Sequence, residues 1–207
     1  MDALRTIGRA PMQTVRPQDL TATYAHPRKS LADLEQRGVV HKVAHGYYCL
    51  VPPEENPATW MPVLEAAAAG VATAKWGEAA TVLMGLSAAR IHGALPRAVG
   101  VATVAVPAGH RPIRLTDREA TIRFIYRDVA ALDAVRVETE LGPTLVTTPA
   151  QTALDLAREP EILQKPDLTA TLKAVLAHAS LEEVAAIAAS QGRTQAALRR
   201  IRQVADQ

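Results

Sequence analysis

The sequence predicts an α+β protein in which an N-terminal winged helix-turn-helix precedes a helical domain that contains a small, mostly antiparallel sheet. The first observation is that residues 1–50 hold three short helical segments and then two strand-like runs around a His-Gly turn. The second is a proline-rich stretch at residues 52–58, which suits neither a helix nor a strand. The third is that helical patterns then enclose several β-branched runs, an order typical of α+β domains.

These patterns divide the 207-residue chain into three parts. We predict a winged helix-turn-helix domain at residues 1–51, a proline-rich linker at residues 52–58, and an α/β domain at residues 59–207 that ends in amphipathic helices. The hydrophobic content of 48% is enough for a sizeable core. The single cysteine, Cys49, excludes an internal disulfide and favours a cytoplasmic location. No apolar run approaches the ~18 residues of a membrane span, so we expect no membrane partner.

The N-terminal elements follow from helix start and stop signals. We expect one short helix within residues 1–9 and another over residues 16–24, with Pro17 early in it. Pro27 starts a third helix, over about residues 28–36, and Gly38 ends it. Residues 39–43 and 47–50 then predict a strand, a turn and a strand. Three helices followed by a hairpin are the order of a winged helix-turn-helix.

The larger domain alternates between helix and strand patterns. We expect helices over residues 59–75 and 78–94, strands over residues 99–107 and 120–126, and a hairpin of residues 135–141 and 144–147 around Gly142-Pro143. Thr148 is the predicted N-cap of the next helix and Pro149 its first residue. Two or three amphipathic helices follow from about Asp167.

The third helix is the predicted DNA-recognition element. Its spacing places Leu31 and Leu34 on one inward face, and the opposite face enters the major groove in helix-turn-helix proteins. Residues 1–50 carry seven Lys and Arg against four Asp and Glu, a net charge of +3 that suits nucleic acid. Lys29 and Gln36 suit base edges, whereas Arg28 and Arg37 suit phosphates. The full predicted DNA-binding set, with two residues from the wing, is Arg28, Lys29, Ser30, Asp33, Gln36, Arg37, Lys42 and His45.

The last helix carries a second group of basic residues. Leu198, Ile201 and Val204 share one face, and the charges lie around the other. These charges form either a second basic surface for DNA or an acidic partner protein, or the ordinary solvated face of a soluble helix. The residues are Arg193, Arg199, Arg200 and Arg202.

No conventional catalytic or cofactor motif is present. The sequence contains no G-x-G-x-x-G, no Walker A loop and no H-R-D motif, so it indicates no catalytic residue and no cofactor. His41 and His45 are four residues apart, a spacing that binds zinc on a helix. They fall here on a strand and a turn without further ligands, so we predict no metal site.

Three motifs resemble the AbiEi-type antitoxins of bacterial abortive-infection and type IV-like toxin–antitoxin systems. Ser30–Val40 with Gly46-Tyr47-Tyr48 is similar to that family's recognition helix and wing. Leu86–Leu95 is similar to its helix with a serine and a His-Gly pair, and Val146–Ala157 to its signature "Thr-Ser-Pro-Ala-Arg-Thr-Leu-Leu-Asp-Leu-Ala". Gln151 stands where the family often has arginine, which puts in doubt any role that needs a cation there.

The resemblance implies a cytoplasmic antitoxin. Its N-terminal domain would repress its own operon at inverted repeats, and its C-terminal domain would antagonise a nucleotidyltransferase-type toxin. A first alternative is an atypical serine protein kinase that phosphorylates the toxin and therefore needs ATP and magnesium. A second alternative is a transcriptional regulator that senses a small ligand.

Overall fold

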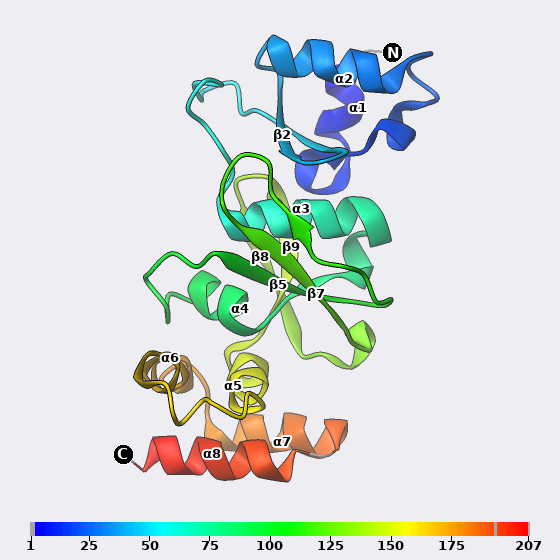
Figure 1. Cartoon of the computed structure of the whole chain (residues 1–207). Coiled ribbons are helices and arrows are strands. Elements are labelled where there is room, and N and C mark those ends of the chain that lie inside the picture. The colour runs from blue at the N-terminus through cyan, green and yellow to red at the C-terminus, as the bar shows by residue number, and fades with distance from the viewer. Residues whose placement is uncertain (1–2, 193, 207) are drawn as a thin grey trace.

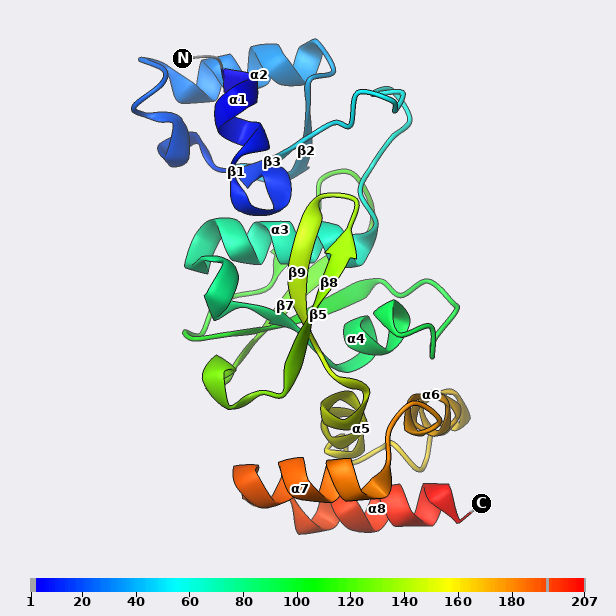
Figure 2. The same cartoon turned by 180° about the vertical axis from the view of Figure 1, so that it is seen from behind.

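The protein is an α+β molecule whose three parts follow one another along its long axis (Figure 1). The computed structural model describes residues 3–192 and 194–206, which form eight α-helices, a three-stranded antiparallel sheet and a six-stranded mixed sheet. The N-terminal module lies at one end, the large sheet with helix α3 in the middle, and helices α5 to α8 at the other end (Figure 1). The same order is seen from behind (Figure 2). The predicted α+β class is confirmed.

The N-terminal module follows the predicted element order. A short helix, a 3-10 turn and a longer helix precede a β-hairpin, and a short strand is added to that hairpin in the order β1-β3-β2. Its small core consists of Ile7, Val15, Leu20, Leu31, Leu34, Val40 and Tyr48. The elements are α1 (Ala3–Gly8), β1 (Thr14–Val15), α2 (Pro27–Gln36), β2 (Val40–Ala44) and β3 (Tyr47–Leu50), with 3-10 turns at Pro11–Gln13 and Pro17–Leu20.

The predicted second helix at residues 16–24 is much shorter than expected. Only Pro17–Leu20 is helical, as a 3-10 turn. Asp19 accepts hydrogen bonds from the Arg16 backbone and guanidinium, which closes this turn locally. This arrangement is a capping box, which satisfies a backbone N–H at the start of the turn but adds nothing to its extension.

The six-stranded sheet is larger and more mixed than the predicted sheet. Its strand order is β6-β7-β5-β4-β9-β8, in which β5–β7 and β4–β9 are parallel and the other pairs antiparallel. Parallel neighbours need a crossover connection, and no local sequence pattern marks such a pairing. The strands are β4 (Val82–Leu83), β5 (Val101–Val106), β6 (Ile113–Arg114), β7 (Thr121–Tyr126), β8 (Ala134–Thr139) and β9 (Gly142–Thr147).

The predicted helix over residues 78–94 is wrong. This segment forms a 3-10 turn, the central strand β4 and the short helix α4 (Gly85–Ile91). Val82 and Leu83 are both buried, one toward each face of the sheet, and they belong to different hydrophobic clusters. A short run that is apolar on both sides does not distinguish a central strand from a buried helix.

Helix α3 (Leu64–Trp76) joins the N-terminal module to the sheet. It is buried along most of its length, and its hydrophobic cluster takes Met12, Val43 and Cys49 from one side and Val104 from the other. Residues 51–63 contain neither helix nor strand, so the irregular segment is longer than the predicted linker at residues 52–58, and the helix expected over residues 59–75 begins only at Leu64. One buried cluster therefore joins the N-terminal module to the large domain across α3. In Figure 1 this helix lies between the module and the large sheet.

The last four helices form a second core on the opposite face of the sheet. Thr148 caps the first of them as predicted, because its hydroxyl accepts a hydrogen bond from the Gln151 backbone and Pro149 takes the first position. Helix α4 packs between this core and the sheet. The bounds are α5 (Pro149–Ala157), α6 (Pro166–Leu176), α7 (Leu181–Gln191) and α8 (Gln195–Ala205).

Candidate functional site

Helix α2 presents a polar face to solvent, as the recognition-helix prediction requires. Pro27 occupies its first position, where the missing N–H costs no hydrogen bond, and Leu31 and Leu34 are buried on its inner face. Gly38 ends the helix with φ +70, a left-handed conformation that a glycine adopts without strain. Of the predicted contact residues on this element, Ser30 is half-buried, and the exposed ones are Arg28, Lys29, Asp33, Gln36 and Arg37.

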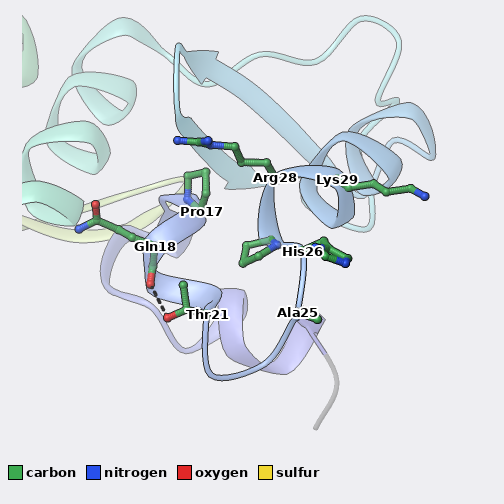
Figure 3. Close-up of a pocket in the computed structure, with 8 residues that line it drawn as sticks. Pro17, Gln18, Thr21, Ala25, His26, Arg28 and Lys29 are labelled. Atoms are coloured by element: carbon green, nitrogen blue, oxygen red, sulfur yellow. Dashed lines mark hydrogen bonds between the residues drawn. The ribbon is translucent and has the colours of Figure 1, made fainter.

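The start of α2 forms one side of a shallow groove. Figure 3 shows Arg28 and Lys29 extending in opposite directions from the first turn of the helix. The other side of the groove is the 3-10 turn at Pro17–Leu20, where the Thr21 hydroxyl donates to the Gln18 carbonyl at 3.1 Å. The groove is lined by Pro17, Gln18, Thr21, Ala25, His26, Pro27, Arg28 and Lys29.

The basic side chains of α2 have no protein counter-ion. Within residues 3–192 and 194–206, neither a hydrogen bond nor an ion pair involves the side chain of Arg28, Lys29 or Arg37. Unpaired, exposed cations at a helix start are free to meet phosphate oxygens. The face therefore keeps the charge that nucleic-acid contact needs.

The β2–β3 hairpin, which is the predicted wing, is attached to the large domain along one edge. The Thr116 backbone N–H donates to the Val43 carbonyl at 3.0 Å, and its hydroxyl donates to the Lys42 carbonyl at 3.1 Å. These bonds cover the outer edge of β2, which would otherwise present unpaired backbone groups. The predicted wing contacts remain accessible, because Lys42 is half-buried and His45 is exposed at the turn.

His41 forms an ion pair with the large domain. Its Nε2 lies 2.7 Å from the Asp117 carboxylate, which also accepts from Arg118 at 2.9 Å. Burial raises the pKa of Asp117, but the hydrogen bonds from His41 and Arg118 outweigh it and lower that pKa to about 2. The described residues contain no group of three or more His, Cys, Asp and Glu side chains that could hold a metal ion.

The second basic group lies at the other end of the molecule. Helix α8 and helix α2 are at opposite ends of the chain's long axis in both views (Figures 1 and 2). Arg199 and Arg202 are exposed, whereas Arg200 donates to the Ala157 carbonyl at 2.8 Å and so stabilises the end of α5. Arg193 lies outside the described residues. The remaining charges of α8 form a surface separate from the α2 face.

The motif residues of the large domain hold its elements together. The Ser87 hydroxyl accepts from the Thr103 backbone N–H at 2.9 Å, which joins α4 to β5. His92 Nε2 lies 2.7 Å from the Thr147 carbonyl oxygen, and the Thr147 and Thr152 hydroxyls are 2.7 Å apart. These side chains are buried or half-buried, so the motif maintains the packing of α4, α5 and the sheet.

The family follows from a match over these elements. A model of the AbiEi antitoxin C-terminal domain matches residues 79–206, more than half of the chain. The chain belongs to the AbiEi antitoxin family. The resemblance inferred from the three motifs is confirmed, and AbiEi membership implies a cognate toxin as partner. No described helix has the length and hydropathy that a membrane crossing requires.

A solved structure has the same fold as this AbiEi antitoxin. The chain is similar to the Rv2827c protein of Mycobacterium tuberculosis, with a TM-score of 0.54 and 20% sequence identity, over 98% of this chain and 75% of that one. The likeness at this identity concerns the fold. No curated protein matches the sequence.

Sequence reasoning missed two polar groups of this AbiEi antitoxin. Asp117 lies 76 residues from its partner His41, and no local spacing joins them. The Asp155 carboxylate is buried, and Arg158, one helical turn away, contacts it at 3.2 Å. The i, i+3 spacing of Asp155 and Arg158 was the available signal for this second pair.

Proposed function

We propose that this AbiEi protein is an antitoxin that represses its own operon through α2 and the wing and neutralises a nucleotidyltransferase-type toxin through its C-terminal domain. The observation that carries the DNA-binding part is the α2 face, where Arg28 and Lys29 of the first turn are exposed and form no ion pair with any other described residue. Family membership supports the antitoxin part.

The proposed docking places the exposed face of α2 in the major groove. Lys29 and Gln36 lie on that face and donate to base edges, while Arg28 and Arg37 flank it and bind phosphates. His45, at the exposed turn of the wing, reaches the adjacent backbone. Inverted repeats in the operator fit two copies of the chain, one for each half-site.

Salt dependence of operator binding tests this interface. Replacing Arg28 and Lys29 together by alanine is expected to weaken binding and to make the slope of log affinity against log salt shallower, by about two units if both side chains contact phosphate. The matched control is the double replacement of Arg199 and Arg202 by alanine, which removes the same charge at the opposite end of the molecule.

Two outcomes decide the interface. Unchanged affinity of the Arg28 and Lys29 variant at both low and moderate salt contradicts the α2 docking. A shallower slope in the Arg199 and Arg202 control instead moves the DNA interface to α8. Fluorescence anisotropy with a duplex from upstream of the gene measures both slopes.

Co-expression with the neighbouring toxin gene tests the antitoxin part. The Arg28 and Lys29 variant is expected to protect cells as the unchanged chain does, because its substitutions lie far from helices α5 to α8. Incubation of both proteins with ATP and magnesium, followed by mass spectrometry, separates antagonism by binding from phosphorylation. A toxin heavier by one phosphate only when this protein is present assigns the kinase mechanism; an unchanged mass assigns antagonism without phosphorylation.

A further inference from the structure

A cavity of about 360 Å³ opens on the sheet face away from α3. Its floor is the outward face of β5 and β7, and its walls are the start of α4 and the segment from the end of α5 to the start of α6. A volume of this size holds a small organic molecule. Its charged lining residues are Arg123, Arg127, Asp155, Arg158, Glu159, Glu161 and Lys165.

The inner wall combines two guanidiniums with one carboxylate. Asp155, whose side chain is 2% exposed, accepts from Arg158 and Gln151 through one oxygen, at 3.2 Å each. Arg158 also donates to Gln191 at 2.9 Å, which fixes its guanidinium in place. Arg127 comes from the neighbouring strand end and forms no ion pair with this carboxylate within the described residues. The group therefore carries an excess positive charge.

Two buried polar atoms of this group have no partner. They are the second carboxylate oxygen of Asp155, Oδ2, and the Nε of Arg127, each of which is buried without a hydrogen bond in the described structure. A buried polar atom that leaves water without gaining a partner costs free energy, so native proteins satisfy nearly all such atoms. One acceptor and one donor without a partner thus belong to residues that line the same cavity.

The remaining charges do not supply the missing partners. Glu161 pairs with Lys165 at the rim, where both side chains are more than half exposed. Glu159 is exposed as well. Burial raises the pKa of Asp155 to about 6 although Arg158 and Arg127 oppose it, so the carboxylate is largely ionised at neutral pH and accepts rather than donates.

We propose that this cavity binds a phosphate group, either inorganic phosphate or the phosphate of a small phosphomonoester. Arg127 and Arg158 bind the anionic oxygens, and guanidinium donors match oxyanions of this geometry. The open oxygen of Asp155 accepts the hydrogen bond of a protonated phosphate oxygen. The carboxylate disfavours sulfate, because sulfate carries no proton at neutral pH and Asp155 must itself take up a proton before it can donate a hydrogen bond to that ion.

The test uses the full chain at pH 7 and constant ionic strength. Inorganic phosphate is titrated by calorimetry and by thermal shift, with sodium sulfate as the second probe. We expect saturable phosphate binding that is at least tenfold tighter than sulfate binding. Titrations of AMP and glycerol 3-phosphate identify the source of the phosphate, since a nucleotide-bearing ligand binds more tightly than the inorganic ion only if its organic part also fits.

Two variants assign the binding to the named residues. Arg127→Met removes the charge at similar size and is expected to weaken phosphate binding at least tenfold, whereas Arg136→Met, on the exposed edge strand β8, leaves it unchanged. Asp155→Asn offers a donor in place of the acceptor, so phosphate and sulfate then bind with similar affinity. This change of preference is measurable even if Arg127→Met does not fold.

The outcomes that overturn the site are specific. Absence of saturable phosphate binding to the unchanged chain rejects it, and so does equal binding by the Arg127→Met and Arg136→Met variants. A preference for phosphate that survives in Asp155→Asn rejects the role of that carboxylate. The site is independent of the proposed function, because Arg127→Met is expected to keep the full salt slope of operator binding.

Discussion

Replacing Gly70 by alanine is expected to force the N-terminal module away from helix α3. A Cβ at this position would lie 2.4 Å from the Thr14 hydroxyl oxygen and 3.2 Å from the Thr14 Cβ. The Thr14 hydroxyl donates to the Met12 carbonyl at 2.7 Å, and Thr14 is buried, so the side chain does not rotate away without losing that bond. The backbone of β1 must therefore shift.

The magnitude follows from two opposing effects. Overpacking by one methyl group costs about 1–3 kcal/mol, and the 2.4 Å contact puts this site in the upper part of that range, at about 2–3 kcal/mol. Alanine recovers up to about 1 kcal/mol over glycine within a helix. The net loss of unfolding free energy is about 1–2 kcal/mol. At 2–4 °C per kcal/mol for a chain of this size, Tm falls by about 2–8 °C.

Differential scanning calorimetry with a double-mutant cycle checks this reasoning. Thr14→Ala removes the closest atom, so adding Gly70→Ala in that background is expected to cost less than half of its cost in the unchanged chain. Gly8→Ala is the control, because its new methyl group meets only Leu50 at an ordinary 3.9 Å. An unchanged or higher Tm for Gly70→Ala refutes the close packing of α3 against β1.

Three further predictions concern pH and the domain boundary. The folded-state pKa of Asp117 is lowered from 3.8 to about 2, so its hydrogen bonds with His41 and Arg118 contribute stability above about pH 4 that is lost as pH falls through 2. Asp117→Asn is expected to remove this loss and to destabilise the protein by about 2 kcal/mol at pH 7, as measured by urea unfolding. The folded-state pKa of Asp155 is instead raised from 3.8 to about 6. Between these two pH values the folded state holds a proton that the unfolded state releases. The free energy of unfolding is therefore expected to fall by about 3 kcal/mol as pH rises from 4 to 6. Asp155→Asn is expected to abolish that decline, and a decline that persists means another group causes it. A fragment that starts at Ala58 is expected to fold and to protect cells. It is expected to melt at a lower temperature than the whole chain, because it exposes the face of α3 that Met12 covers. Equal melting temperatures would show that this contact adds no stability.

The sequence by itself determined the elements whose signals are local. Helix α2 follows from Pro27, the Leu31 and Leu34 spacing and Gly38, and α5 follows from Thr148 and Pro149, because each signal acts within one or two turns of its own helix. The exposed basic face of α2 was predictable for the same reason: once the apolar face is known, helical geometry places the remaining residues.

Only the tertiary structure decided how distant segments meet. Strand β4 is two residues long and buried on both faces, so its strand state depends on neighbours β5 and β9 rather than on its own periodicity. The pairing of His41 with Asp117 joins side chains 76 residues apart. Arg127 and Asp155 face one cavity because the sheet and α5 pack together. Charges and hydrogen-bonding groups so far apart along the chain interact only once the fold has placed them side by side. A local sequence pattern does not predict which of them will be neighbours.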